Sequence, residues 1–321
     1  MTMSGMTSMS STLRAPGTIA FVIPVYRNER AVTLTYEKLT GLFNGPLRGW
    51  QYTMVFVDDG SDDRSPEELR AIRARDDRVR IVSFTRNFGQ MAAMLAGFKQ
   101  AVGDVVLHLS ADLQDPVDLI PSMVGEWQKG GEVVIAHRVN REDTWSSRLS
   151  SRIFYGIVRV SYPQIPSGGF DYTLLDRVVV DAFNDIDVRN RFFQGDLLWF
   201  GYRTTFIPYT RQRRTIGRSQ YTFSKKLKNS LDAILDSSYL PIRFISAAGV
   251  VTALIGFLYA LDIIYARWRH QIPVEGWAPI MILLLVIGGV IMVMLGIIGE
   301  YIWRIYDEVR GKPNYVVRRI E

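Results

Sequence analysis

The chain has 321 residues, 48% of them hydrophobic and 12% aromatic, so its composition excludes a disordered or fibrous protein and provides for a sizeable core. It holds 38 Lys and Arg against 32 Asp and Glu, a net charge of +6 that favours an anionic partner such as nucleic acid, a phosphorylated substrate or an acidic lipid surface. The lack of cysteine excludes disulfides, thiolate catalysis and cysteine-ligated metals, and the three histidines stand too far apart in the sequence to favour a histidine-built metal site.

Residues 1–17 are rich in Met, Ser and Thr, lack the basic start and apolar centre of a signal peptide, and are expected to form a frayed tail. After them, short apolar runs rich in β-branched residues alternate with helical patterns. The expected strands are Ile19–Val25, Tyr52–Val57, Val79–Phe84, Val105–Leu109 and Val133–Ala136, and the expected helices are Pro66–Arg75, Gln90–Ala101 and Leu119–Gln128. This alternation predicts an α/β domain with a mostly parallel sheet and ligands at the carboxyl ends of its strands.

The first two expected strands end in polar segments. The first runs into Pro24-Val25-Tyr26-Arg27-Asn28-Glu29, where a dinucleotide-binding domain has GxGxxG, so this segment disfavours NAD. The second ends in Asp58 and Asp59, a carboxylate pair able to accept hydrogen bonds from a base or a ribose. Together with Gly60 and Ser61, the pair equally favours a tight turn and helix cap that needs no ligand, and both interpretations stay open.

The fourth expected strand leads into Ser110-Ala111-Asp112-Leu113-Gln114-Asp115-Pro116. Mg²⁺ and Mn²⁺ prefer carboxylate and carbonyl oxygens, so Asp112 and Gln114 are candidate ligands for a divalent cation beside donor phosphates. Asp115, directly before Pro116, equally suits a cap of the following helix. The two interpretations are compatible with each other.

Two long uncharged runs follow residue 240. They are Phe244–Leu261, which Ile263–Ala266 continues beyond Asp262, and Ala278–Gly299. Each is close to the roughly 20 residues with which a helix crosses ~30 Å of hydrocarbon, so they predict a transmembrane hairpin. A buried hairpin of a soluble protein is the alternative, but such helices usually carry polar residues at every turn. Basic residues are concentrated outside the hairpin rather than in its link, which places both termini in the cytoplasm.

The segments IPVYxNE, VDDGS, ADLQDP, GxSxY and GEYIWRIYDEVRGKP, in this order and spacing, resemble the polyprenyl-phosphate glycosyltransferases of glycosyltransferase family 2, which include dolichol-phosphate mannose synthase and bacterial undecaprenyl-phosphate sugar transferases. The similarity covers residues 18–319. It implies a GT-A (Rossmann-like) catalytic domain in a multi-pass protein of the inner membrane. The implied divisions are a catalytic domain at 18–222, a juxtamembrane amphipathic segment at 223–241, two transmembrane helices at 242–303 and a cytoplasmic C-terminal tail at 304–321.

The resemblance implies an inverting enzyme that moves one sugar from a nucleotide-diphosphate sugar to a polyprenyl phosphate on the cytoplasmic face. It favours UDP and undecaprenyl phosphate, implies Mg²⁺ or Mn²⁺ as cofactor, and is compatible with a homotetramer. No nucleic-acid partner is expected, because no recognition motif accompanies the basic charge. The alternative is a catalytically weakened membrane adaptor that binds sugar nucleotide or lipid phosphate. Its support is Ser110, Thr173 and Gln220, which depart from the residues usual in the family.

The resemblance also assigns roles to individual residues. The residues implied to bind the nucleotide sugar are Pro24, Tyr26, Glu29, Asp58, Asp59, Arg214 and Ser219, and those implied to bind the acceptor phosphate are Arg138, Arg148 and Ser151. Asp112 and Gln114 would hold the metal. Asp171, with Asp112, would be catalytic. Arg148 fits a basic helix face on anionic lipid equally well. The segment around Arg214 also fits a basic loop next to the membrane.

Overall fold

The computed structural model describes residues 13–138, 155–156, 158–166, 169–186, 188, 191–210, 240–269 and 277–321. The chain divides into two compact units. One unit comprises Met1–Ile234 together with Pro313–Glu321, and the other comprises Leu235–Lys312. The C-terminal residues therefore belong to the same unit as the N-terminal two thirds of the chain.

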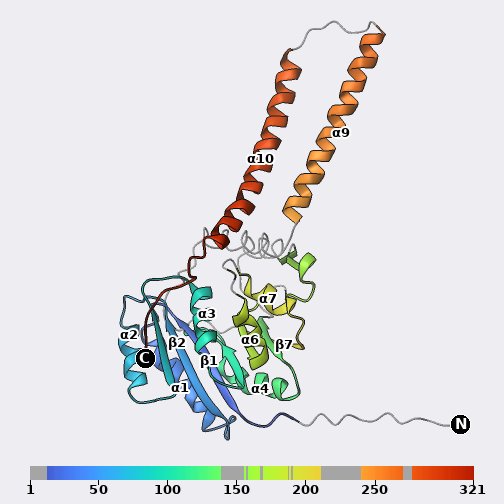
Figure 1. The fold of residues 1–321 in the computed structure, drawn as a ribbon. Coiled ribbons are helices and arrows are strands. Elements are labelled where there is room, and N and C mark those ends of the chain that lie inside the picture. The colour runs from blue at the N-terminus through green and yellow to red at the C-terminus, as the bar shows by residue number, and fades with distance from the viewer. Residues whose placement is uncertain are drawn as a thin grey trace, which may run out of the picture. The chain divides into compact units, whose positions relative to one another are not determined.

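The first unit is built on a sheet, of which β1, β2 and β7 are labelled in Figure 1. Within the described residues it has eight strands in the order β7-β5-β6-β4-β1-β2-β3-β8. The strands are β1 Thr18–Val25, β2 Gln51–Asp58, β3 Val79–Phe84, β4 Val105–His108, β5 Val133–Arg138, β6 Tyr172–Asp176, β7 Thr204–Tyr209 and β8 Val317–Ile320. The pairs β1–β2, β1–β4, β2–β3 and β5–β7 are parallel, whereas β6 is antiparallel to β4 and β5, and β8 is antiparallel to β3. The predicted mostly parallel sheet is confirmed.

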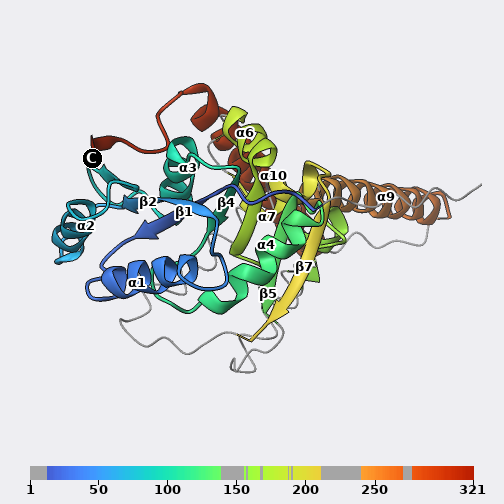
Figure 2. The same cartoon turned by 90° about the horizontal axis from the view of Figure 1, so that it is seen from below.

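Helices cover both faces of this sheet (Figure 2). The helices are α1 Ala31–Phe43, α2 Ser65–Arg73, α3 Gln90–Gln100, α4 Ile120–Gln128, α6 Arg177–Asp185 and α7 Phe193–Trp199, and a 3₁₀ turn at Val117–Leu119 precedes α4. Residues of α1, α2 and α4 pack in one core, and residues of α3, α6 and α7 pack in the other. Phe21 and Val22 of β1 enter opposite cores, because successive side chains of a strand alternate between its faces. Burial on both faces explains why β1 is almost uniformly apolar.

Both ends of the chain carry contacts within this unit. Arg14 forms an ion pair with Asp176 and lies over the Trp127 ring, 4.8 Å from its centroid, although the sequence suggests a frayed tail to residue 17. The segment 304–321, expected as a tail, contains the end of the last helix and strand β8. A four-residue strand of this kind has too weak a pattern to be recognised without its partner strand.

The described part of the second unit contains the helices α9 Leu240–Trp268 and α10 Trp277–Val309 (Figure 1). Met294 of α10 lies 3.5 Å from the position that a Cβ atom would take at Gly249 of α9, so the helices pack against each other. Within the described residues, the segment Val286–Val309 is long and apolar enough to cross a membrane, with a mean hydropathy of 2.0. The apolar part of α9, Ile245–Tyr259, is shorter.

Candidate active site

The loop that follows β1 is fixed by side chains of the loop that follows β2. Within Tyr26–Glu29, the backbone N–H of Arg27 donates to Ser61 Oγ at 3.1 Å, and the N–H of Asn28 donates to Ser65 Oγ at 2.9 Å. Arg27 has a φ of 53°, a left-handed conformation that costs energy for a residue other than glycine. The two loops therefore form one polar rim at the carboxyl ends of β1 and β2.

Asp58 and Asp59, at the end of β2, are both buried. Asp58 accepts a hydrogen bond from the N–H of Ser61 at 2.9 Å, and Asp59 accepts from the N–H groups of Phe88 and Gly89 at 2.6 and 2.9 Å. Burial raises the pKa of both carboxyls, and these hydrogen bonds offset part of the rise. The pair thus organises the turn, and a carboxylate oxygen has a second lone pair with which it can accept from a ligand.

The loop after β4 contains the two candidate metal ligands. Asp112 is 4% exposed and accepts a hydrogen bond from the N–H of Gln114 at 3.2 Å. Between them, Leu113 has a φ of 58°, which turns the backbone sharply. No cluster of three or more His, Cys, Asp or Glu side chains suited to a metal occurs in the described part of the chain. The side-chain oxygens of Asp112 and Gln114 are hard ligands. They fit a divalent cation that takes its other ligands from the phosphates of a nucleotide sugar and from water.

A polar network joins this loop to β5, β6 and β7. The Tyr209 hydroxyl donates to Asp115 Oδ1 at 2.9 Å and accepts from Arg138 Nε at 3.2 Å. Arg138 Nη2 lies 3.5 Å from Asp171 Oδ2. Burial lowers the pKa of Arg138, but the negative charge of Asp171 and the contact with Tyr209 raise it by more. The pKa therefore lies above its usual value, and the guanidinium stays charged. The side chain of Asp171 is 56% exposed, so its carboxylate is accessible to a ligand.

A buried histidine lies below Asp171. The Nδ1 atom of His108 is 2.8 Å from the backbone oxygen of Asp171, and because a carbonyl can only accept, Nδ1–H is the donor. Burial lowers the pKa of His108, which favours the neutral ring. Its Nε2 atom has no hydrogen-bond partner, in surroundings that include the rings of Phe98 and Phe193. His108 thus fixes the backbone at Asp171 from within the core.

Comparison with known proteins decides the family. Residues 20–183 match the model of glycosyl transferase family 2, and residues 240–305 match that of the GtrB C-terminal hairpin. The glycosyltransferase YkcC of Bacillus subtilis, itself uncharacterized, is 36% identical over 94% of this chain and 93% of its own length. The chain belongs to glycosyltransferase family 2.

A second relative is consistent with this membership. A prophage-derived bactoprenol glucosyl transferase of Shigella flexneri is 34% identical over 94% of this chain and 97% of its own length. Among solved structures, glucosyl-3-phosphoglycerate synthase from Mycobacterium tuberculosis matches with a TM-score of 0.48 and 19% identity, over 68% of this chain and 77% of that one. That structural similarity is too low for an inference about substrate.

The structure of this glycosyltransferase groups the residues singled out in the sequence along one edge of the sheet. Pro24 and Asp58 lie at the ends of β1 and β2, and Tyr26, Glu29 and Asp59 follow these strands. Asp112 and Gln114 follow β4, Arg138 is the last residue of β5, and Asp171 directly precedes β6. Ser110 and Thr173 stand in the same region, and the hydroxyl of Thr173 is buried without a partner. The remaining candidates, Arg148, Ser151, Arg214 and Ser219, lie outside the described residues.

Sequence reasoning missed Tyr209 and His108 as site residues of the enzyme. Tyr209 is the last residue of the run Thr204–Tyr209, which is rich in β-branched and aromatic residues. If this run had been predicted as a strand, the Tyr209 hydroxyl would have been expected at the sheet edge. The spacing of the histidines only disfavours a metal site, whereas His108 is a core residue whose ring donates to the backbone of Asp171. His108 on β4 pairs with Thr173 on the antiparallel strand β6. The alternation of apolar runs and helical patterns in the sequence did not reveal this pairing.

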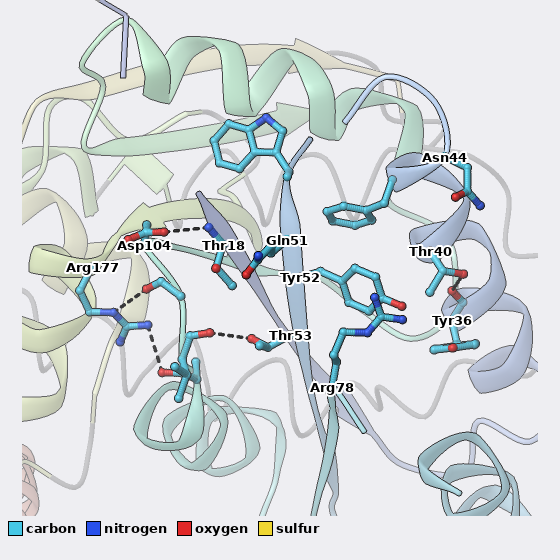
Figure 3. A pocket seen from close by; sticks show the side chains of 15 residues that line it. Thr18, Tyr36, Thr40, Asn44, Gln51, Tyr52, Thr53, Arg78, Asp104 and Arg177 are labelled. Carbon is cyan, nitrogen blue, oxygen red and sulfur yellow. Dashed lines mark hydrogen bonds between the residues drawn. The ribbon is translucent and has the colours of Figure 1, made fainter. Parts of the chain in front are cut away.

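A cavity of about 1170 Å³ lies at the opposite end of the sheet, where β1 and β2 begin (Figure 3). Several of its polar groups form hydrogen bonds with one another. The backbone N–H of Thr18 donates to Asp104 at 2.7 Å, and Arg177 donates to the carbonyl oxygens of Gly103 and Ala101 at 2.9 and 3.0 Å. Because parallel α/β domains bind ligands at the carboxyl ends of their strands, we place the active site at the other edge.

Proposed function

We propose that this glycosyltransferase transfers one sugar, with inversion, from a UDP-sugar to a polyprenyl phosphate, and that the acceptor is undecaprenyl phosphate. The observation that carries the proposal is the contact of Arg138 with Asp171 at 3.5 Å, which pairs a partly buried, charged guanidinium with an exposed carboxylate. A guanidinium binds phosphate oxygens in a bidentate manner, and a carboxylate beside it orients the attacking group. The name of the Shigella relative, a bactoprenol glucosyl transferase, supports a polyprenyl acceptor.

The donor is proposed to lie along the ends of β1, β2 and β4. Asp58 and Asp59 would accept hydrogen bonds from the nucleoside, and Pro24, Tyr26 and Glu29 would border it. Asp112 and Gln114 would hold Mg²⁺ or Mn²⁺, which supplies positive charge to the departing diphosphate when bound. Arg214 and Ser219 are proposed to add contacts to the diphosphate, which would reinforce the electrostatic stabilisation of the leaving group.

The acceptor is proposed to bind at Arg138, with Arg148 and Ser151 as further contacts to its phosphate. A phosphomonoester has a second pKa near ~6, so the acceptor is already largely dianionic at neutral pH and needs little help in losing a proton. Asp171 therefore acts mainly by orienting the acceptor through Arg138. The hydrogen bond from His108 to the backbone of Asp171 limits the movement of that carboxylate.

The membrane arrangement is also a proposal. The segment Val286–Val309 and the shorter apolar part of α9 are proposed to cross the inner membrane as a hairpin, with the catalytic domain and both termini in the cytoplasm. The domain limits follow the sequence analysis, except that β8 joins the catalytic domain rather than a free tail. A homotetramer is compatible with this arrangement.

The proposal is tested with the purified full-length protein in detergent, given a panel of UDP-, GDP- and dTDP-sugars with and without undecaprenyl phosphate. We expect release of UDP from one UDP-sugar that requires both Mg²⁺ or Mn²⁺ and the lipid phosphate. Activity that is equal in chelator would contradict the metal assignment. Nucleotide binding without any transfer, with every donor and lipid, would instead favour the adaptor alternative.

A further inference from the structure

The last residues of the chain pair with β3, one strand away from Asp58. Val82 pairs with Ile320, and the backbone N–H of Thr85 donates to the carbonyl oxygen of Val316 at 3.1 Å. Because β8 is antiparallel to β3, the start of β8 lies at the carboxyl end of β3. That end belongs to the edge of the sheet that carries the candidate active site.

Arg318 is the extra residue of an irregularity in this pairing. Ser83 pairs with Arg319 and Phe84 pairs with Val317, so Arg318 has no partner across the ladder. A bulge of this kind redirects a side chain, and bulges are frequent next to active sites. The redirected guanidinium of Arg318 donates through Nη2 to the carbonyl oxygen of Thr85 at 3.3 Å. The bulge thus holds a positive charge at the carboxyl end of β3.

The tail also supports the loop that holds Asp59. The ring of Tyr315 stacks on Phe84, with centroids 5.0 Å apart and an interplanar angle of 15°. Phe84 in turn makes an edge contact with Phe88, at 5.7 Å, and the backbone N–H of Phe88 donates to Asp59 at 2.6 Å. A chain of contacts therefore connects the C-terminal segment with the second carboxylate of the pair.

The charge of Arg318 acts on Asp58. Burial raises the pKa of Asp58, the hydrogen bonds from Ser61 lower it, the charge of Asp63 raises it and the charge of Arg318 lowers it. The neighbouring Asp59 is affected by the charge of Asp58 itself and by that of Arg86. Asp58 pairs with Ser83, and Ser83 pairs with Arg319, so two strand spacings, roughly 10 Å, separate the backbone of β2 from that of β8. An arginine side chain can span much of that distance.

We propose that strand β8 forms the outer wall of the nucleotide-binding site and that Arg318 is a positioning residue for the donor, acting through Asp58. The inference rests on the proposed function, which places the nucleotide along Asp58 and Asp59. It makes donor binding dependent on a segment that follows the hairpin in the chain. The positive charge of Arg318 favours the ionised form of Asp58 against the effect of burial, and an ionised carboxylate accepts hydrogen bonds from the nucleoside more strongly than a neutral one.

The test measures the Kd of UDP for the full-length protein in detergent with Mn²⁺, at pH 5.5 and pH 8, together with KM for the sugar donor and for the lipid phosphate. Arg318→Gln removes the charge but keeps a donor for Thr85, and Arg318→Lys restores the charge. Arg319→Gln is the matched control, because Arg319 is a regular ladder residue whose guanidinium pairs with Glu321 at 3.2 Å.

We expect Arg318→Gln to weaken UDP binding roughly threefold to fivefold at pH 5.5, where loss of the positive charge favours protonation of Asp58, and less than about twofold at pH 8. The KM for lipid phosphate should not change, Arg318→Lys should recover most of the affinity, and Arg319→Gln should bind as the wild type does. The inference is overturned if Arg318→Gln binds UDP normally at pH 5.5 or if Arg319→Gln loses as much. A wild-type protein that binds no UDP would reject the proposed donor, and this inference with it.

Discussion

At the scale of single residues, the site depends on the contact between Arg138 and Asp171. In the sequence, only the family resemblance singles out these two residues, of which one ends a strand and the other precedes one. The fold brings them together because β5 and β6 are antiparallel neighbours, with Ala136 opposite Tyr172. The end of one strand therefore meets the beginning of the other. This geometry leads to two predictions.

Replacing Arg138 by Ala removes a charge-assisted contact to the acceptor phosphate worth about 1.5–3 kcal/mol. We expect the KM for lipid phosphate to rise by more than about tenfold, with much less change in the KM for the sugar donor. Steady-state kinetics with each substrate varied in turn measures both values. Arg203→Ala is the control, because this exposed arginine contacts the Lys129 carbonyl, at 2.7 Å, and no predicted site residue. An effect confined to the donor would place Arg138 in another part of the site.

At Asp171, the two possible roles of a carboxylate give different results. If it orients the acceptor, Asp171→Asn, which keeps the shape and one acceptor oxygen, should lose less activity than Asp171→Ala, and the difference should persist above pH 7.5. Rates measured across pH 6 to 9 decide between the roles. A general base would be indicated if both variants were equally inactive near neutral pH and the Asn variant recovered only as the pH rose.

At the scale of elements, the rim of the sheet away from the active site is held by Asp76. Asp76 accepts hydrogen bonds from the hydroxyls of Tyr52 and Tyr36 at 2.7 and 2.9 Å and forms an ion pair with Arg78 at 2.8 Å. Burial raises the pKa of Asp76, but these hydrogen bonds outweigh it and lower the pKa to about 2. The network connects α1, β2 and the turn before β3.

Because the pKa of folded Asp76 lies below its unfolded value of about 3.8, its ionised form stabilises the fold above that pH, and this contribution is lost as the pH falls towards 2. Asp76→Asn should lower the free energy of unfolding at pH 7 by about 1–3 kcal/mol and remove part of the loss between pH 4 and 2. Denaturant unfolding at several pH values measures both effects. Asp77→Asn is the control, since the Asp77 side chain is fully exposed, and a similar loss there would contradict the assignment.

Elements differ in how far the sequence predicts them. Strand β3 has the predicted limits Val79–Phe84, because a run rich in β-branched residues begins directly after the charged residues 76–78 and ends at an aromatic residue before the polar Thr85. Helix α1 was not predicted, since its apolar positions are interrupted by polar ones and no capping side chain marks its start at Ala31. Strand β8 depends wholly on its pairing with β3, which no local pattern encodes. Candidate site residues at the ends of predicted strands could be named from the sequence, whereas Tyr209 and Arg318 lie on strands that were not predicted.

At the scale of the whole molecule, the proposed hairpin predicts a definite topology. The chain contains no cysteine, so single cysteines can be introduced without background labelling. We expect the cysteine of the Gln271→Cys variant to react with a membrane-impermeant thiol reagent applied to intact cells. A cysteine added after Glu321 should react only when the cells are lysed, because both ends of a hairpin lie on the same side. Labelling of both positions from the same side would contradict the two-span arrangement.

The central claim is that the strand-end site transfers a sugar to a polyprenyl phosphate, and mass spectrometry of the lipid product tests it most directly. The purified full-length protein is incubated with UDP-sugar, Mn²⁺ and undecaprenyl phosphate, and in parallel with undecaprenol, which lacks the phosphate. The account predicts that the phosphate lipid gains the mass of one sugar residue, that undecaprenol gains none, and that Asp112→Asn makes no product. Consumption of the UDP-sugar with no change in the lipid phosphate, or equal transfer to undecaprenol, would contradict it.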